Sequence, residues 1–385
     1  VQQTVTQESN LMRLETGAPL PDGVSRSDTV WTTELQGGID QPIGRQRVFG
    51  QASLRHTRFA RNGAYDNDGY RVRLGAEGST AGRLEGSLSV SLQRNQGQLS
   101  NDESGVLTRS NTEQLRQVES ALRWGASARL AAEASLEWRS VDFSAPTFAS
   151  RAFRQGAIYA GLRHSPSAAL WWSVGWRETD GRYPKFRRLT DGSFEGDHYR
   201  RRELELRAAL KPSGASEFQA RLGLGRTSYD NATARDISGV FGAFDWTWRP
   251  TGALRLRTHV SRDPSQDSYF LNTLFGRGTL SYDRQATTWQ WRADMDLTGK
   301  TALYLAWGWT DRSLVRNIEV AVGTLPGVQA DDRTWQLSTG LRWQPLRTLL
   351  VGVDLVAEQR REASALSRPY RSTAIATFGQ LTLEP

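Results

Sequence analysis

The feature that most constrains this sequence is an alternation of apolar and polar residues along almost the whole chain. An alternating segment is followed by a short turn rich in Gly, Pro and Ser, a second alternating segment and a longer polar stretch, with a repeat of roughly 40 residues. Such alternation indicates a β-strand with one apolar face, because successive side chains of a strand point to opposite sides. In a helix the same residues would be spread around the circumference. The pattern therefore predicts an all-β protein.

The strand number follows from the short turns, each of which has an alternating segment on both sides. The turns are Asp40–Gln46, Ala76–Ala81, Gly125–Arg129, Ser165–Ala169, Lys211–Ser216, Arg249–Ala253, Thr298–Thr301 and Gln344–Thr348. These eight hairpins give sixteen strands, and Gln3–Leu14 and Ser372–Leu383 add one at each end. We therefore predict about eighteen antiparallel strands in a single domain that spans residues 1–385.

Longer polar connections alternate with the short turns. They are Ala60–Asn67, Gln96–Glu113, Val141–Arg154, Thr179–Asp197, Asp263–Arg284, Asp311–Asp332 and Gln359–Arg371. Short turns on one rim and long loops on the other are typical of bacterial outer-membrane barrels, whose long loops face the cell exterior. We expect Thr179–Asp197 and Asp263–Arg284 to fold inward as gates.

Composition favours a membrane barrel over other β-rich folds. Only 38% of residues are hydrophobic and mean hydropathy is -0.56, and no stretch approaches the roughly 18 to 20 apolar residues of a spanning helix. Strands that show alternate side chains to lipid and to water fit this balance. A soluble β-sandwich of this length would need several domains and linkers, which are not visible. We therefore expect a transmembrane β-barrel in the bacterial outer membrane, numbered from the mature chain after removal of an export signal.

The chain is rich in tryptophan, with 14 residues, and many of them lie near the ends of the apolar runs. This placement predicts two interfacial girdles. The tryptophans are Trp124, Trp138, Trp176, Trp246, Trp248, Trp289, Trp307, Trp309, Trp335 and Trp343.

Several chemistries are disfavoured by the residue content. Cysteine is absent, which excludes thiolate metal sites, disulfides and cysteine nucleophiles. The four histidines form no metal-type pair, so we expect no metal site and no cofactor. Nucleotide-binding motifs are also absent. The basic clusters Arg187–Arg188 and Arg200–Arg202 lie in or beside a predicted external loop, so we expect them to face solvent or anionic lipopolysaccharide and no nucleic acid.

His259 and Ser261 form the one arrangement that suggests an enzyme. Residues two apart on a strand point the same way and could act as base and nucleophile, a spacing that resembles outer-membrane phospholipases and lipid A deacylases. Here the apolar row Leu254 to Val260 takes the lipid face, which sends both residues to the lumen. No third member is apparent in the sequence. We therefore expect no enzyme activity, and an active pair would require a hydrogen bond between the two side chains.

Charged residues occupy the positions between the apolar ones and are expected to face the lumen. We expect more than half of them to pair across neighbouring strands and brace the wall, and an excess of arginine with some aromatic residues to form a path for a hydrated anionic polymer. The residues assigned to this path are Arg55, Arg71, Arg73, Arg123, Arg139, Arg163, Arg177, Arg207, Arg221, Arg255, Arg257, Arg292, Arg342, Tyr159, Trp171 and Tyr304. The acidic residues expected beside them are Glu85, Glu119, Glu133, Glu137, Glu203, Glu205, Asp245, Asp294, Asp296 and Asp354.

Short motifs in the N-terminal region add a family resemblance. The run Glu8-Ser9-Asn10-Leu11-Met12-Arg13-Leu14, then Ser27-Asp28-Thr29, Gly44-Arg45-Gln46-Arg47 and Asp66-Asn67-Asp68-Gly69-Tyr70, resembles the EpsL-type outer-membrane proteins of exopolysaccharide gene clusters, within the broader β-barrel porin group. The resemblance spans nearly the whole chain and offers no catalytic residues.

The resemblance implies export of a secreted exopolysaccharide across the outer membrane, with periplasmic and inner-membrane proteins as partners, as in biofilm formation. A barrel of this strand number encloses a lumen wide enough for an aqueous channel. We therefore expect a channel for polysaccharide export through an arginine-rich polar lumen. The alternative is a diffusion porin for small hydrophilic solutes.

Overall fold

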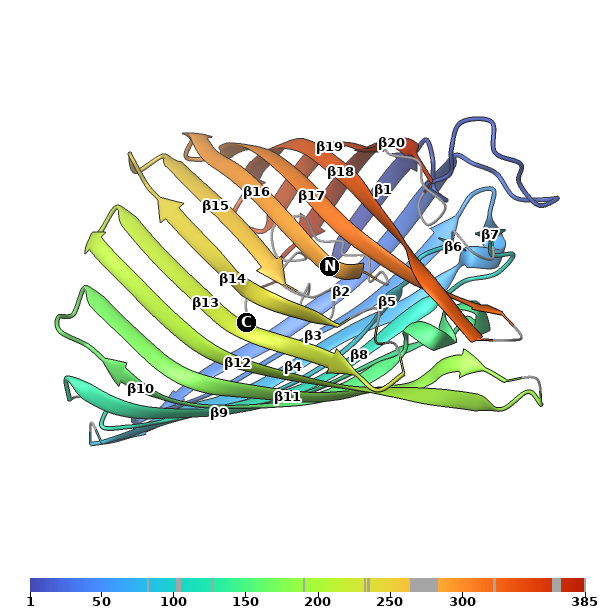
Figure 1. Cartoon of the computed structure of the whole chain (residues 1–385). Coiled ribbons are helices and arrows are strands. Elements are labelled where there is room, and N and C mark those ends of the chain that lie inside the picture. The colour runs from blue at the N-terminus through green and yellow to red at the C-terminus, as the bar shows by residue number, and fades with distance from the viewer. Residues whose placement is uncertain are drawn as a thin grey trace.

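The chain forms a closed antiparallel β-barrel, as a computed structural model shows for residues 1–81, 83–101, 105–126, 128–189, 191–231, 233, 236–263, 283–320, 323–361 and 368–383. The barrel strands are β1 (Gln2–Glu8), β2 (Asp28–Ile43), β3 (Gln46–Phe59), β4 (Asn67–Thr80), β5 (Leu84–Gln96), β8 (Thr112–Trp124), β9 (Leu130–Phe143), β10 (Phe153–His164), β11 (Leu170–Arg188), β12 (Phe194–Ser213), β13 (Ser216–Tyr229), β14 (Ile237–Trp248), β15 (Leu254–Asp263), β16 (Asp283–Thr298), β17 (Thr301–Val320), β18 (Gly323–Leu346), β19 (Leu349–Arg360) and β20 (Tyr370–Leu381). The sheet has 18 strands and closes because β1 pairs with both β2 and β20 (Figure 1). The predicted fold class and strand number are confirmed.

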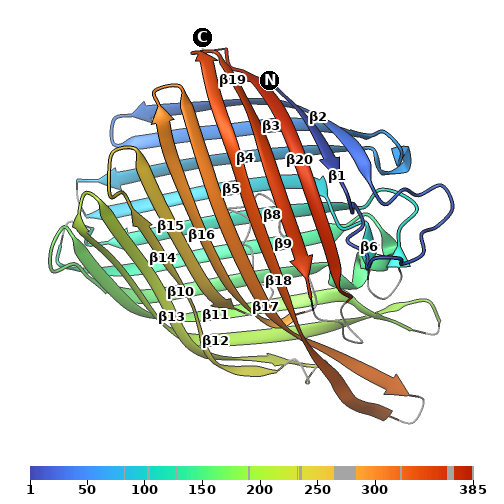
Figure 2. The same cartoon turned by 90° about the horizontal axis from the view of Figure 1, so that it is seen from above.

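Both chain termini and all eight short turns lie at one rim of the barrel. The amino group of Val1 donates to the carbonyl of Leu381 at 2.8 Å, and the two ends lie side by side in Figure 2. The longer connections gather at the opposite rim, on the right in Figure 1. Because short turns face the periplasm and longer loops the exterior in outer-membrane barrels, we call these the periplasmic rim and the extracellular rim.

Several predicted boundaries were wrong. The first strand ends at Glu8 instead of Leu14, and the turn between β4 and β5 begins after Thr80. Thr179–Asp197 and Asp311–Asp332 are mostly strand: they form the extensions of the β11–β12 and β17–β18 hairpins, which project beyond the neighbouring strands (Figure 2). Their apolar alternation ends because a hairpin in water needs no apolar face, although backbone pairing continues. Most of Asp263–Arg284 lies outside the described residues.

The extracellular connections contain short elements. The β5–β8 connection carries a two-stranded ribbon, β6 (Ser100–Asn101) and β7 (Gly105–Val106). The 3-10 helices η1 (Gly63–Tyr65) and η2 (Pro146–Arg151) lie in the β3–β4 and β9–β10 connections. Among the described residues, no helix has the length and apolar character needed to cross a bilayer.

The outer face of the barrel carries a continuous apolar belt. Leu206 of β12 lies directly opposite Val174 and Leu222 of the neighbouring strands, and all three are exposed. Trp124, Trp246, Trp248 and Trp343 lie near the periplasmic rim and Trp138, Trp176, Trp289, Trp309 and Trp335 nearer the extracellular rim, as two interfacial girdles would require. Exposed apolar rows around a closed barrel are stable only in lipid. The protein is therefore located in the bacterial outer membrane.

Charge on the outer face is confined to the extracellular half. Among the described strand residues, no Arg, Lys, Asp or Glu points outward near the periplasmic rim. Outward arginines outnumber outward carboxylates near the extracellular rim. These arginines are Arg58, Arg94, Arg116, Arg154, Arg182, Arg200, Arg202, Arg226, Arg262, Arg333 and Arg371.

Three connections at the extracellular rim are anchored in the same way. The buried Asp28 carboxylate accepts the backbone N–H of Asn62, Asn111 accepts that of Ala145, and Asp197 accepts that of Asn231. Each acceptor precedes its donor by 34 residues. Each contact therefore spans one periplasmic hairpin, and it supplies an acceptor for a backbone donor of the extracellular connections.

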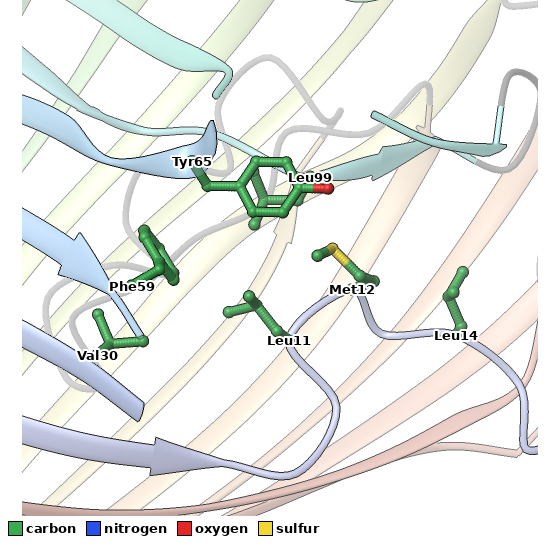
Figure 3. Close-up of a cluster of buried hydrophobic side chains, with 7 residues drawn as sticks. All are labelled: Leu11, Met12, Leu14, Val30, Phe59, Tyr65 and Leu99. Atoms are coloured by element: carbon green, nitrogen blue, oxygen red, sulfur yellow. The ribbon is translucent and has the colours of Figure 1, made fainter. Parts of the chain in front are cut away.

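The β1–β2 connection, residues 9–27, packs against the inner face of the extracellular rim. Leu11, Met12 and Leu14 form a buried cluster with residues of the wall and of two neighbouring connections (Figure 3): Val30, Phe59, Tyr65 and Leu99. Asn10 fixes the segment by donating to the carbonyls of Leu14 and Arg371 at 2.7 and 2.9 Å.

Arg13 ties this connection to the wall. Its guanidinium lies 3.2 Å from Glu358 of β19 and 3.5 Å from Glu8 of β1. Burial lowers the pKa of Arg13, but the two carboxylates outweigh burial and hold the pKa above its ordinary value, so the side chain stays charged. Of the residues that carry the family resemblance, Asn10, Arg13 and Asp28 are thus structural anchors of the extracellular mouth, whereas Gly44–Arg47 lies at a periplasmic turn.

Candidate functional site

The inner face of the barrel, which we call the lumen wall, is set by strand register. Directly opposed residues share a face and successive residues alternate, so Arg207, between the exposed Leu206 and the outward Ala208, points inward. The same test places every residue assigned to the lumen from sequence on the lumen wall. They are Arg55, Arg71, Arg73, Arg123, Arg139, Arg163, Arg177, Arg207, Arg221, Arg255, Arg257, Arg292, Arg342, Tyr159, Trp171 and Tyr304.

Most of these arginines form ion pairs with carboxylates of the same strand, of a neighbouring strand or, for Arg177 and Glu137, of the next strand but one. Side-chain N–O distances are 2.9 Å for Arg55–Glu34, 3.2 Å for Arg163–Glu133, 2.7 Å for Arg177–Glu137, 3.6 Å for Arg221–Glu205, 2.8 Å for both Arg257–Asp294 and Arg292–Asp294, and 2.7 Å for Arg342–Asp354. Arg123 pairs with Glu85 and Arg207 with Glu205. Apart from Arg292–Asp294 and Arg207–Glu205, which lie within one strand, these contacts connect different strands, so the arginines brace the wall.

Three predicted arginines differ from the rest. Arg71 and Arg73 of β4 and Arg255 of β15 are exposed and form no ion pair within the described part of the chain. Arg73 lies with its guanidinium carbon 5.8 Å from the ring centre of Phe49. These three side chains are the arginines of the predicted set that remain available to a passing solute.

Aromatic rings on the lumen wall lie flat over glycines of neighbouring strands. A Cβ added at Gly75 would lie 2.3 Å from the Phe49 ring, and one at Gly175 would lie 2.6 Å from the Tyr159 ring. Tyr304 covers Gly340 in the same way, with 2.5 Å to the added Cβ. Only glycine leaves room for a ring at these places.

Arginines cover the exposed sides of these rings. The guanidinium carbon of Arg207 lies 3.7 Å from the centre of the Tyr159 ring, that of Arg292 lies 4.1 Å from Tyr304, and that of Arg163 lies 3.8 Å from Trp171. Ring and carboxylate together fix each guanidinium along the wall. The sequence identified these arginines and rings but gave no sign that they stack on one another.

Arg201 of β12 belongs to a buried group of charges and was not predicted to face the lumen, whereas Glu203 and Glu205 of the same group were. Arg201, 2% exposed, pairs with Glu203 at 2.5 Å, and Glu205 has no exposed surface. Arg200–Arg202 were predicted to lie in or beside an external loop. In the structure these residues lie within β12 and alternate between the two faces. Extending the alternation of Leu204 and Leu206 by two residues would have assigned Arg201 to the lumen.

The lumen wall carries basic and acidic side chains in nearly equal numbers over the described strands. All ten predicted acidic residues point inward, and so do Glu34, Glu77, Asp332 and Glu358. The predicted excess of arginine in the lumen is therefore not found there. The surplus positive charge of the strands lies on the outer face at the extracellular rim.

Aromatic residues on β10–β13 form a second cluster near the extracellular mouth. Ring centres are 5.9 Å apart for Phe153 and Tyr183, 5.8 Å for Tyr183 and Tyr199, and 5.5 Å for Tyr199 and Tyr229. All four rings are buried. Apolar alternation does not reveal this cluster, because its tyrosines lie beyond the apolar belt, in or beside polar segments predicted as loops.

Buried residues also narrow the lumen. Phe148 of η2, which has no exposed surface, lies 5.9 Å from Phe143 of the wall. Together with residues 11–14, this helix reduces the opening at the extracellular mouth. Farther down the wall, Ser173, Glu205 and Ala306 have no exposed surface.

The His259–Ser261 arrangement does not form a catalytic pair. Nδ1 of His259 lies 2.8 Å from a carboxylate oxygen of Asp245, a partner on β14 that the sequence analysis did not identify. The buried Nε2 of His259 makes no hydrogen bond, so it does not contact Ser261. A general base must reach the proton that it removes, and this arrangement does not meet that requirement. Within the described residues, no group of three or more His, Asp or Glu side chains is arranged to hold a metal ion.

Comparison with known proteins gives similarity of architecture only. No protein-family model matches the sequence, and no curated protein is detectably similar. Among solved structures, the chain is similar to the FrpB iron transporter apoprotein of Neisseria meningitidis, with a TM-score of 0.48 and 9% identity over 94% of this chain and 61% of that one. It therefore spans about three fifths of FrpB.

Two proteins of Pseudomonas aeruginosa are closer to this chain in length. OccK11 (OpdR) has a TM-score of 0.46 and 14% identity, with 100% of this chain and 94% of that one covered. The outer membrane protein OpdK has a TM-score of 0.45 and 14% identity, with 98% and 96% covered.

Proposed function

We propose that this protein is a diffusion channel for small hydrophilic solutes in the outer membrane. The observation that carries the proposal is a closed 18-stranded wall with an apolar outer belt and an inner face lined by paired charges. A polar lumen lets a hydrated solute cross without losing its water, whereas the outer belt keeps the barrel in the bilayer.

The size of the solute follows from the narrowed lumen. Residues 11–14 and Phe148, which pack against the inner side of the mouth, leave an opening there that is narrower than the barrel itself. Such a passage favours small solutes over a bulky hydrated polymer. Polysaccharide export, with its periplasmic and inner-membrane partners, rests on the family resemblance alone and stays a prediction.

Selectivity among ions is expected to be weak. Most charges of the lumen wall are neutralised by pairing, so the field along the lumen is small. Arg71 and Arg73 are exposed and unpaired over the described residues, and they contribute the local preference for anions. The channel should therefore pass both ion signs, with anions somewhat favoured near β4.

Planar bilayers test this proposal. Wild-type protein should give stable open conductance. In the variant Arg71→Gln/Arg73→Gln, the reversal potential measured in a KCl gradient of about tenfold should move toward cation preference, because two positive charges leave the lumen. Arg94→Gln/Arg116→Gln is the matched control: it removes two arginines from the outer face, so the reversal potential should not change.

Two results would contradict the proposal. One is a wild-type barrel that inserts into the bilayer but gives no conductance for small ions. The other is a deletion strain that loses polysaccharide secretion while uptake of small solutes is unchanged, which would support the export function.

A further inference from the structure

The outer face of β10–β13 carries a group of exposed arginines just above the apolar belt, which we call the arginine patch. Its members are Arg154, Arg182, Arg200, Arg202 and Arg226. Register places Arg154 directly opposite Arg182, and Arg202 directly opposite Arg226. Like charges directly opposite each other destabilise a sheet, so the patch contains two unfavourable pairs on neighbouring strands.

Carboxylates on the same face neutralise only part of this charge. Glu178 lies 3.1 Å from Arg202 and 3.8 Å from Arg200, and Asp180 lies 3.7 Å from Arg200. Asp236 lies 3.7 Å from Arg226. Arg154 and Arg182 have no carboxylate partner among the residues that the structure describes. A surplus of guanidinium groups therefore faces outward, where an anion from outside the protein would relieve the repulsion.

The apolar residues below the patch restrict what this anion is. Leu204 and Leu224 lie two residues closer to the membrane centre than Arg202 and Arg226, and Trp176 lies directly opposite Leu204. Trp176, Leu204 and Leu224 are 49%, 51% and 61% exposed. Two residues of a strand span about 7 Å. A ligand that fits both features has an anionic head at the arginines and hydrocarbon chains along the leucines, as an anionic lipid has.

The distribution of charge selects the leaflet and the head group. The outer face near the periplasmic rim has no charged side chain other than histidine among the described strand residues, so the patch belongs to the external leaflet alone. Guanidinium groups bind phosphate through paired hydrogen bonds and keep their charge at all relevant pH values. We propose that the arginine patch binds the phosphate groups of a phosphorylated glycolipid of the outer leaflet, a lipopolysaccharide.

The test compares two variants that each lose four outward arginines. The patch variant is Arg154→Gln/Arg182→Gln/Arg202→Gln/Arg226→Gln. The control variant, Arg94→Gln/Arg116→Gln/Arg262→Gln/Arg371→Gln, removes the same charge elsewhere on the same rim, where no two of the arginines are directly opposed. Purified full-length protein is titrated with bisphosphorylated lipid A, and bound lipid is counted by native mass spectrometry.

The patch variant should bind bisphosphorylated lipid A at least about tenfold more weakly than wild type, because several charge-assisted hydrogen bonds are lost. The control variant should stay within about threefold of wild type. Wild type should bind dephosphorylated lipid A as weakly as the patch variant binds the phosphorylated form. Equal binding by patch variant and wild type would overturn the proposal.

Two further measurements keep the proposal testable. Phosphatidylglycerol should not displace lipid A from wild type at equal concentration. If phosphatidylglycerol competed as well as lipid A itself, the patch would be a general surface for anionic lipids, and the assignment to a glycolipid would be overturned. If the patch variant does not fold, thermal unfolding of wild type decides the question. Bisphosphorylated lipid A should then raise the unfolding temperature more than the dephosphorylated form, and an equal effect would refute the proposal.

Discussion

Arginine substitution on the outer face should destabilise the barrel according to its depth in the bilayer. Leu206 of β12 is 41% exposed and lies midway between Arg202, at the charged extracellular edge, and Leu210, near the periplasmic turn. Leu206→Arg therefore places a guanidinium near the bilayer midplane, where it costs about 2–4 kcal/mol. At about 1.4 kcal/mol per tenfold change, the unfolding equilibrium constant should rise about 30-fold to 700-fold.

Leu130→Arg is the matched control. Leu130 is 60% exposed and begins β9 at the periplasmic rim, where the same substitution costs about 0–1 kcal/mol. The assay is reversible chemical unfolding of both variants in lipid vesicles, followed by tryptophan fluorescence. Equal losses of stability at the two positions would refute the reasoning, because an outer row that is not in hydrocarbon has no depth dependence.

Two further substitutions test the lumen wall and the loop anchors. Gly75→Ala should reduce the free energy of unfolding by about 1–3 kcal/mol, because its Cβ would overlap the Phe49 ring. Phe49→Ala in the same chain should recover part of this loss. Gly379→Ala is the control and should be neutral, because nothing lies near its added Cβ. If the double variant is no more stable than Gly75→Ala alone, the ring does not determine the requirement for glycine. Asp28→Ala should cost about 1–3 kcal/mol and expose residues 60–66 to limited proteolysis, because the backbone N–H groups of Arg61 and Asn62 lose their acceptor. Asp331→Ala, which removes an exposed carboxylate, should leave the proteolysis pattern as in wild type, and identical patterns for both variants would contradict the anchoring role.

The sequence was sufficient to predict the barrel and the direction of its side chains. Apolar alternation around Leu206 and Leu222 assigns the lipid face, and the residues between them then face the lumen, as Arg207 and Arg221 do. This inference is reliable within the belt because a slip of one residue would turn every apolar side chain toward water. The short turns likewise predicted all eight periplasmic connections.

Outside the belt the same rule fails, because hydrocarbon no longer constrains the sequence. Near the extracellular rim the outer face of β12 carries Arg200 and Arg202 in place of apolar residues, so Arg201 and Tyr199 were not assigned to the lumen. Residues 9–14 alternate weakly and were predicted as strand, although Leu11 and Met12 pack in a cluster made of distant segments.

Partners across strands could not be predicted either. The Asp245–His259 contact depends on the register between β14 and β15, which the sequence of one strand does not specify. The near balance of charge on the lumen wall also required knowing which carboxylates share a face with which arginines. The arginine patch became visible only when its residues were placed in register on the outer face.

The central claim, that alternate side chains line a water-filled conducting path, can be tested with single-channel conductance and a charged thiol reagent. The chain contains no cysteine, so each introduced cysteine is the sole target. Modification of Arg73→Cys, on the lumen wall, should change the conductance, whereas Leu74→Cys, which is 56% exposed on the lipid face, should show no change. A change at both positions, or at neither in a conducting barrel, would contradict the account.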